Sequence, residues 1–227
     1  MKLERQIHTL SRLTAAIAAL VLMLAAVPAV AQTAGKIAGS AHDFSTQGWS
    51  GGQICVVCHT PHNSNTGVTD APLWNHATTA ATFTPYASPT MNATAALGGQ
   101  PAGTSKLCLS CHDGTIAVDS FGGSSGTTFL SGGVNIGTNL SNDHPISIVY
   151  DAALATADGG LNNPAATTVT IGSGARTKTD TIAALLLPGG SVQCASCHDV
   201  HNTYVDGGTL LKVTSAGSKI CLVCHNK

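Results

Sequence analysis

The sequence predicts a mostly irregular, coil-rich chain with short helices and few short strands, wrapped around something other than its own side chains. One observation behind this fold class is composition: 227 residues include 25 Gly but only four Phe, three Tyr and two Trp. Ordering each residue costs roughly 1–2 kcal/mol of backbone entropy, and so few large apolar side chains offset little of it. The other observation is that all eight Cys recur in one motif, C-x-x-C-H. Disulfides, metals or cofactors are the usual staples of a chain whose apolar core is small.

The N-terminal segment, residues 1–31, has the pattern of a secretory signal peptide. Three basic residues precede an apolar run over residues 13–27, and a proline and the small triplet Ala-Val-Ala follow. An uncleaved membrane anchor is the alternative, but the run is shorter than the roughly 20 residues that span a bilayer. Residues 32–227 contain no second long apolar segment, so we expect a secreted protein without a membrane span. The formal net charge of −1 at pH 7 offers no basic face for nucleic acid.

Four copies of C-x-x-C-H divide the mature chain into two modules. The first and third copies lie in GGQICVVCHTPHN and GGSVQCASCHDVHN, and the second and fourth in SKLCLSCH and SKICLVCH. The order of first kind then second kind occurs twice, which is an internal repeat. The repeat predicts one module over residues 32–125 and another over residues 126–227, together forming one compact unit. The copies occupy residues 55–59, 108–112, 194–198 and 221–225.

Regular secondary structure is weakly signalled between the motifs. We expect a short helical turn at each C-x-x-C-H, a helix in residues 180–187 and a strand in residues 167–172. Residues 120–139 and 161–168 are rich in turn-forming residues, so we predict loops there.

The histidine after every second cysteine indicates what the motif does. Paired cysteines of a secreted chain usually form disulfides, and two C-x-x-C pairs can bind zinc, but neither use needs that histidine. A thioredoxin-like thiol pair would need one motif, not four. Covalent haem attachment does need it, because two thiols add to the two vinyl groups of one porphyrin and the imidazole ligates the iron. The sequence therefore predicts four haem c groups, attached through Cys55, Cys58, Cys108, Cys111, Cys194, Cys197, Cys221 and Cys224.

The histidines predicted to ligate these irons fall into two groups. The motif histidines supply one axial ligand each. For the other axial position, Met91 is the only methionine after the signal peptide, so His/Met ligation can serve at most one iron. Five further histidines for four positions imply bis-histidine ligation throughout. The motif histidines are His59, His112, His198 and His225, and the others are His42, His62, His76, His144 and His201.

The repeat also suggests how these five histidines are used. His42 and His144 precede the two modules' motifs, and His62 and His201 each lie three residues after a motif histidine. Three residues are about one helical turn, so we expect His62 and His201 to ligate a neighbouring iron rather than their own. His76 stands alone, in an insertion between the two motifs of the first module. Two alternatives stay open for it, an iron ligand or a surface or hydrogen-bonded core histidine.

Irons with protein ligands on both faces favour electron transfer over catalysis. Metal catalysis needs an open coordination position, and bis-histidine ligation leaves none, so we do not expect an enzyme. Four haems on so short a chain should lie in a row with close contacts and supply the missing apolar core. Two alternatives remain, a soluble periplasmic tetrahaem shuttle and a multihaem reductase with one five-coordinate haem.

Stretches around the motifs resemble one known family. SAHDFS, CVVCHTPHN, APLWNHA, SKLCLSCHDGTIAVDSFGG, SNDHPISIVYD and CASCHDVHN are similar to stretches of OmcE-type tetrahaem extracellular cytochrome filament subunits of metal-reducing bacteria. The resemblance implies a doubled-CxxCH multihaem cytochrome that polymerises head to tail into a secreted, conductive filament, or nanowire. It also implies electron transfer to external acceptors and other redox proteins, and one axial histidine donated by an adjacent subunit. We expect His42, near the predicted mature N-terminus, to be that ligand.

Overall fold

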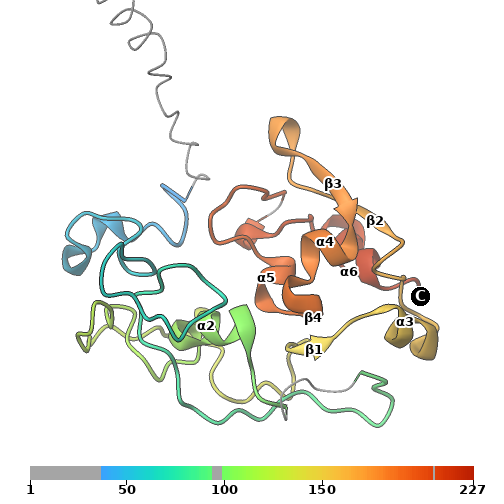
Figure 1. Ribbon diagram of the computed structural model, residues 1–227, viewed down its shortest axis with the longest axis horizontal. Helices are drawn as coiled ribbons and strands as arrows, with labels where there is room; N and C mark the ends of the chain where they lie inside the picture. Colours follow the sequence, from blue (N-terminus) through green and yellow to red (C-terminus); the bar gives the residue numbers. More distant parts are fainter. Residues whose placement is uncertain (1–36, 94–98, 207) are drawn as a thin grey trace, which may run out of the picture. The chain divides into compact units, whose positions relative to one another are not determined.

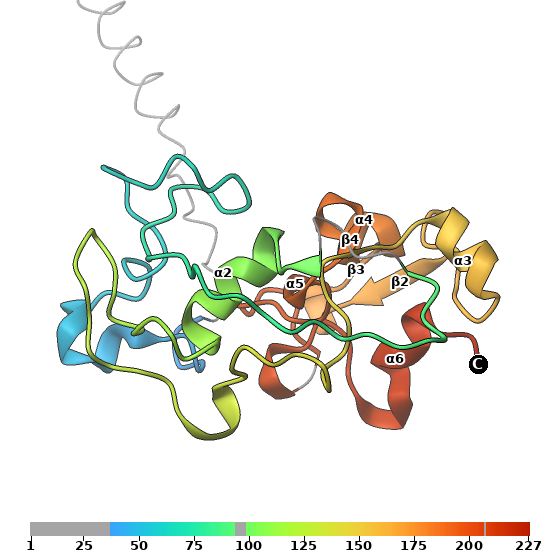
Figure 2. The same ribbon diagram turned by 90° about the horizontal axis from the view of Figure 1, so that it is seen from below.

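A computed structural model of the chain describes residues 37–93, 99–206 and 208–227 (Figures 1 and 2). The predicted signal peptide, residues 1–31, lies outside these residues. All the described residues fall in one structural unit, residues 35–227. Within them, no helix is long and apolar enough to cross a membrane.

Long coil segments connect the short helices and strands of this unit (Figure 1). The α-helices are α2 (Gly103–His112), α3 (Ala152–Asp158), α4 (Ile182–Leu186), α5 (Cys194–Cys197) and α6 (Lys219–Cys224). Two antiparallel pairs contain the strands: β1 (Ile148–Val149) with β4 (Ser191–Val192), and β2 (Thr168–Ile171) with β3 (Lys178–Thr181). Three-residue turns of 3-10 helix lie at Phe44–Thr46, Gly48–Ser50, Gly132–Val134, Gly174–Arg176, Pro188–Gly190, Gly208–Leu210 and Ala216–Ser218.

The β2–β3 hairpin leads directly into α4. Thr168 pairs with Thr181, and the hydroxyls of Thr170 and Thr179 hydrogen-bond across the exposed face at 2.8 Å. Thr181 then caps α4, because its side chain accepts a hydrogen bond from the Ala184 N–H at 3.2 Å. β2 and α4 lie in the segments where the sequence predicts a strand and a helix.

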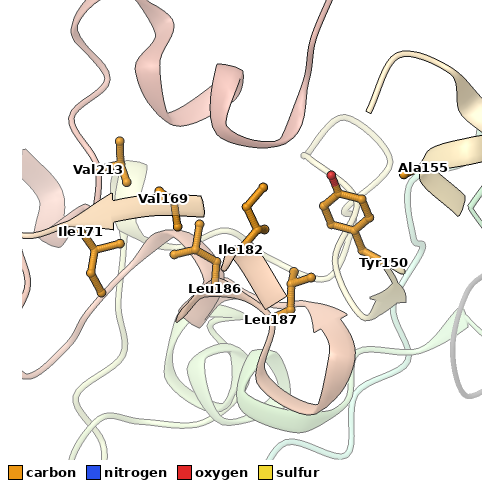
Figure 3. Close-up of a cluster of buried hydrophobic side chains, with 8 residues drawn as sticks. All are labelled: Tyr150, Ala155, Val169, Ile171, Ile182, Leu186, Leu187 and Val213. Carbon is orange, nitrogen blue, oxygen red and sulfur yellow. The ribbon is translucent and has the colours of Figure 1, made fainter. Parts of the chain in front are cut away.

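The larger core cluster lies in the second half of the chain, around β2 and α4 (Figure 3). β2 alternates exposed and buried residues, so Val169 and Ile171 share its buried face. They pack with Ile182 and Leu186 of α4, and Ile182 is 0% exposed. The buried members are Tyr150, Ala155, Val169, Ile171, Ile182, Leu186, Leu187 and Val213. The chain thus builds one small apolar core from its own side chains.

A smaller cluster of Phe83, Leu109 and Leu140 joins α2 to two loops. Thr84 forms a parallel β-bridge with Asn139, so these loops lie side by side. The contact crosses the predicted module boundary between residues 125 and 126, and the two-module division stays a prediction.

α2 packs against α5, and Ser105 lies at their contact. Ser105 is 0% exposed. Its N–H donates to Gln193 Oε1 at 3.2 Å, and its Oγ accepts from the Cys194 N–H at 2.9 Å. These bonds hold the second and third C-x-x-C-H motifs beside each other.

Candidate haem sites

Each C-x-x-C-H motif folds as a helical turn that ends at its histidine. The histidine N–H donates to the carbonyl of the first cysteine, at 2.8 Å from His59 to Cys55 and 3.0 Å from His198 to Cys194. The fourth motif closes in the same way at 2.9 Å, and the second motif is the last turn of α2. Positions three and four apart share one face of a helical turn. The two sulfur atoms and the imidazole of each motif are therefore near one another, as attachment to one porphyrin requires.

The cysteines of the motifs are free thiols, and six of the eight are partly buried. Burial raises the pKa of Cys58 to about 11 and that of Cys111 to about 12, so both are uncharged at neutral pH. Within the described residues, no group of three or more Cys, His, Asp or Glu that could hold a metal ion is found.

The thiols of Cys108 and Cys194 hydrogen-bond to each other across the α2–α5 contact. This bond raises the pKa of Cys108 and is the main cause that lowers the pKa of Cys194 to about 7. The attachment cysteines of the second and third motifs are therefore in direct contact.

Three motif histidines bind a backbone carbonyl through Nδ1. The distances are 2.7 Å from His59 to Pro72 O, 2.8 Å from His112 to Val134 O, and 2.8 Å from His198 to Thr209 O. A carbonyl oxygen only accepts, so Nδ1 carries the proton and the lone pair of the neutral ring lies on Nε2. This is the arrangement of a metal-ligating histidine, whose tautomer and orientation are fixed by the bond at its other nitrogen.

Three motif histidines also face a second histidine ring from another part of the chain. Two imidazoles that bind one metal from opposite faces, with bonds of about 2.0–2.1 Å, hold their ring centroids roughly 6 Å apart. The pairs are His42 and His112 at 6.2 Å, His59 and His201 at 6.2 Å, and His144 and His225 at 6.4 Å. Each pair thus has the spacing of two axial ligands on one iron.

The C-terminal pair of motifs matches a known family model. That model describes a doubled CXXCH motif and matches residues 188–227, which contain the third and fourth copies. The match supports a multihaem c-type cytochrome. Comparison with curated proteins finds no match for the chain. The C-x-x-C-H motifs indicate covalently bound haem c, and c-type cytochromes of this kind are electron carriers rather than enzymes in the typical case.

His42 has the surroundings of a neutral ligand to a haem iron. Burial lowers the pKa of His42, and three neighbouring histidines lower it further. The ring is therefore uncharged at neutral pH, as iron ligation requires. Its buried Nδ1 has no hydrogen-bond partner. His42 faces His112 of the same chain, and the expectation that His42 reaches into the next subunit stays a prediction.

His144 opens onto a mostly apolar hollow. The hollow is small and open to solvent, and it is lined by Met91, Tyr86, Leu140 and Ile146, among others. His144 Nδ1 lies 3.0 Å from Pro145 O. This leaves Nε2 as the ring nitrogen that can bind a metal.

The three remaining histidines are placed differently from the paired ones. His62 and His198 are exposed, and among the described residues neither has a histidine ring opposite it in the contacts above. His76 is 2% exposed, and its ring nitrogens face the carbonyls of Ala77 at 2.8 Å and Ala117 at 3.1 Å. Of the two alternatives for His76, this geometry favours the hydrogen-bonded core histidine.

Some residues around the motifs carry no signal in the sequence. The acceptors at Pro72, Val134 and Thr209 are backbone carbonyls, which any residue can supply. Trp74 is 8% exposed and its indole meets the His59 ring edge-on at 6.3 Å. Only the rarity of tryptophan in this chain singles it out.

Proposed function

We propose that this protein carries electrons through four c-type haems, each attached by one C-x-x-C-H motif and ligated by two histidines. The observation that supports this best is the set of histidine pairs. Each joins a motif histidine to a histidine outside the motifs, with ring centroids 6.2–6.4 Å apart. The paired residues are far apart in the sequence, so this spacing is a product of the fold and not of the motif.

Cysteines and histidines have different roles in holding each haem. The two cysteines of a motif would form the thioether bonds to one haem, and the motif histidine and its paired histidine would ligate the iron. When bound, the haem supplies a one-electron redox couple. With both of these ligands supplied by the protein, the iron would exchange electrons and would have no open position for a substrate.

The first three motifs are neighbours in space, which supports a continuous electron path. The Asn75 N–H donates to the Cys58 carbonyl at 2.9 Å, and the next residue, His76, contacts the Cys111 sulfur at 3.5 Å. One short segment therefore joins the first motif to the second. Ser105 joins the second motif to the third through its bond with the Cys194 N–H.

The third and fourth motifs meet at the larger core cluster. The Lys212 N–H donates to the Cys197 carbonyl at 2.8 Å. The next residue, Val213, is buried in the cluster against which Val223 and Cys224 of α6 pack. We therefore propose that electrons pass the motifs in the order of the sequence.

The proposal includes polymerisation head to tail through a shared iron. His62 and His198 are exposed and unmatched among the described histidine pairs, so one copy lacks an axial ligand that another can provide. In this assembly, His62 ligates the iron held by the partner subunit's His198. Heterologous contacts of this kind build an open filament when they do not close into a ring. His62 takes this role instead of His42, because His42 faces His112 in its own chain.

Export and an extracellular role belong to the same proposal. They are supported by the predicted signal peptide, residues 1–31, and by the resemblance to OmcE-type filament subunits. The partners are then further copies of the chain, other redox proteins, and external electron acceptors.

A multihaem reductase is the second candidate, and the exposed ring of His198 favours it. In a monomer, the iron at this histidine keeps an open position, which substrate reduction needs. A substantial high-spin fraction in the ferric spectrum of native secreted protein would support this candidate. A fully low-spin spectrum would support electron transfer alone.

Haem content and electron microscopy test the main proposal. We expect four haems per chain in a pyridine haemochrome assay and filaments in negative stain. Fewer than four haems would contradict the attachment sites. A stable monomer with four low-spin haems would point to the soluble shuttle instead.

Two matched variants test which histidine crosses between subunits. We expect His62→Ala to keep four haems, to lose the sixth ligand of one of them, and to remain monomeric. His42→Ala should also show one high-spin haem but still polymerise. The opposite pattern would return the inter-subunit role to His42.

A further inference from the structure

A short backbone segment runs antiparallel to the end of the first motif. This segment, residues 72–75, begins with the carbonyl that accepts the hydrogen bond from the motif histidine. The Thr60 N–H then donates to the Leu73 carbonyl at 3.0 Å, and the Asn75 N–H donates to the Cys58 carbonyl at 2.9 Å. Hydrogen bonds on both sides therefore fix the backbone of Leu73 beside the motif.

Residues 209–212 form the same arrangement at the third motif. The segment again begins with the carbonyl that binds the motif histidine. The Asp199 N–H donates to the Leu210 carbonyl, and the Lys212 N–H donates to the Cys197 carbonyl, both at 2.8 Å. The second residue of each segment is a leucine, and it is the one residue that the sequences PLWN and TLLK share.

Both leucines have a left-handed backbone conformation. The angle φ is +55° at Leu73 and +60° at Leu210. Bulky side chains rarely adopt this conformation, because Cβ comes too close to the following carbonyl oxygen. At two other left-handed positions, just after the same motifs, the chain has Asn63 and Asn202, and asparagine tolerates the conformation. Leucine in an unfavourable conformation, at two equivalent positions, indicates a role for its side chain.

The chain by itself gives the Leu73 side chain little to pack against. Leu73 is 52% exposed, whereas the next residue, Trp74, is 8% exposed. Leu210 is partly buried. Exposed apolar surface gains nothing from the hydrophobic effect, so neither the conformation nor the exposure of Leu73 is explained by contacts within the chain. A group bound at the motif would explain both.

We propose that Leu73 and Leu210 are haem-contact residues, which would cover apolar surface of the haems of the first and third motifs. Each leucine directly follows the peptide group that orients the motif imidazole. An apolar side chain at this place would keep water from the haem, and water access is one of the factors that set a reduction potential. The inference rests on the proposed function, because it requires haems on residues 55–59 and 194–198.

The test compares substitutions at these leucines in the haem-loaded protein. Leu73→Asn and Leu210→Asn introduce a polar side chain that tolerates the left-handed backbone. Leu73→Met keeps an apolar side chain of similar size. Phe129→Asn is the control, since it replaces an apolar side chain of similar exposure, 54%, outside both segments. The measurements are haem-resolved redox titration, denaturant titration and negative-stain microscopy.

We expect each asparagine variant to keep four haems and to make one haem harder to reduce, a different haem in each variant. Water near a haem favours the oxidised iron, which carries the greater positive charge, so the reduced-to-oxidised ratio of that haem should fall severalfold at a fixed electrode potential. The ratio of folded to unfolded protein should fall about tenfold, which is about 1.4 kcal/mol. Leu73→Met and Phe129→Asn should leave both ratios unchanged. If Leu73→Asn does not fold, Leu73→Ala takes its place with the same expected shifts.

Two results would overturn the inference. Unchanged reduction potentials with equal or higher stability in the asparagine variants would make the leucines ordinary exposed residues. Unchanged potentials with loss of filaments would assign the leucines to a contact between copies of the chain. Mass spectrometry separates both results from a failure of the proposed function, which would appear as a wild-type peptide containing residues 55–59 or 194–198 without haem.

Discussion

The second and fourth motifs, SKLCLSCH and SKICLVCH, have similar sequences and opposite surroundings. In α2, Leu109 is 1% exposed and Ser105 is 0% exposed, whereas Leu222 at the position matching Leu109 in α6 is 49% exposed. α6 has no buried residue at all among its described side chains. Haem attachment is thus a local property of the motif, and haem environment is a property of what packs against it.

The neighbours of the two helices explain this difference. α5 and the loop that contains Phe83 cover α2. α6 touches the larger core cluster only with partly buried side chains, and the Tyr150 hydroxyl donates to the Cys224 carbonyl at 3.3 Å. Haems attached at these two motifs would therefore meet solvent to different extents, which is one of the factors that set reduction potentials.

Replacing the matched leucines should give the largest difference between the two motifs. Leu109→Ala leaves a cavity beside Phe83 and Leu140, and we expect it to lower the free energy of unfolding by about 2–5 kcal/mol. Leu222→Ala removes an exposed side chain and should change this free energy by about 0.5 kcal/mol or less. Denaturant titration of the haem-loaded variants measures both. Equal losses would mean that α6 is covered in the native assembly.

The matched serines should give a smaller difference. Ser105→Ala removes the acceptor of the partly buried Cys194 N–H, and we expect a loss of about 1–3 kcal/mol. Ser218 has a φ of +58°, where glycine has no steric cost. Ser218→Gly should therefore be neutral or stabilising by about 1 kcal/mol or less. The same denaturant titration checks both, and a destabilised Ser218→Gly protein would contradict this account of α6.

Salt should affect the fourth haem more than the second. Cys221 and His225 are exposed, so mobile ions reach the charges around this motif, whereas α2 is covered. Raising the ionic strength from about 0.01 M to about 1 M shortens the Debye length from about 30 Å to about 3 Å. Haem-resolved redox titrations at the two salt concentrations should show a shift in the fourth haem and little in the second. An equal shift in the reduction potentials of the two haems would contradict the difference in solvent exposure between the two motifs.

The smallest effect concerns Asp158, which binds the exposed end of the chain near α6. The Gly160 N–H lowers the pKa of Asp158, and the Lys227 ammonium, 3.4 Å away, lowers it further. A lowered pKa means that this carboxylate stabilises the fold above its ordinary value of 3.8 and loses that effect as the pH falls through the folded-state pKa. Asp158→Asn should therefore be slightly less stable than wild type at pH 7 and equal to it in strong acid. Thermal unfolding over this pH range tests the sign.

The sequence predicted local elements better than paired ones. β2 and α4 lie within the predicted residues 167–172 and 180–187, because alternation and helix-forming residues are visible over one segment. β3 was not predicted, since its polar residues form a strand only by pairing with β2. The burial of Leu109 and the exposure of Leu222 have no signal in two nearly identical motifs.

The histidine pairs show the same limit at the candidate site. The repeat identified the candidate ligands but not their partners, because partners depend on how distant segments dock. His42 comes to lie opposite His112 through a series of aromatic contacts, in which Phe44 meets Trp49 at 5.6 Å and Trp49 meets Phe121 at 6.1 Å. These contacts attach the N-terminal segment to the loop after α2, and no spacing rule in the sequence predicts them.

The carbonyls that accept hydrogen bonds from the motif histidines affect how the sequence of such chains can change and how the chains fold. Each lies 11, 13 or 22 residues further along the chain than its histidine, and each is a peptide group that any side chain leaves in place. Substitutions in these loops should therefore leave the hydrogen bonds in place as long as the loop length is preserved. A deletion of a few residues would break the bond and let the imidazole rotate. Each loop therefore fixes the orientation of its histidine, and it can do so only after its residues have been synthesised.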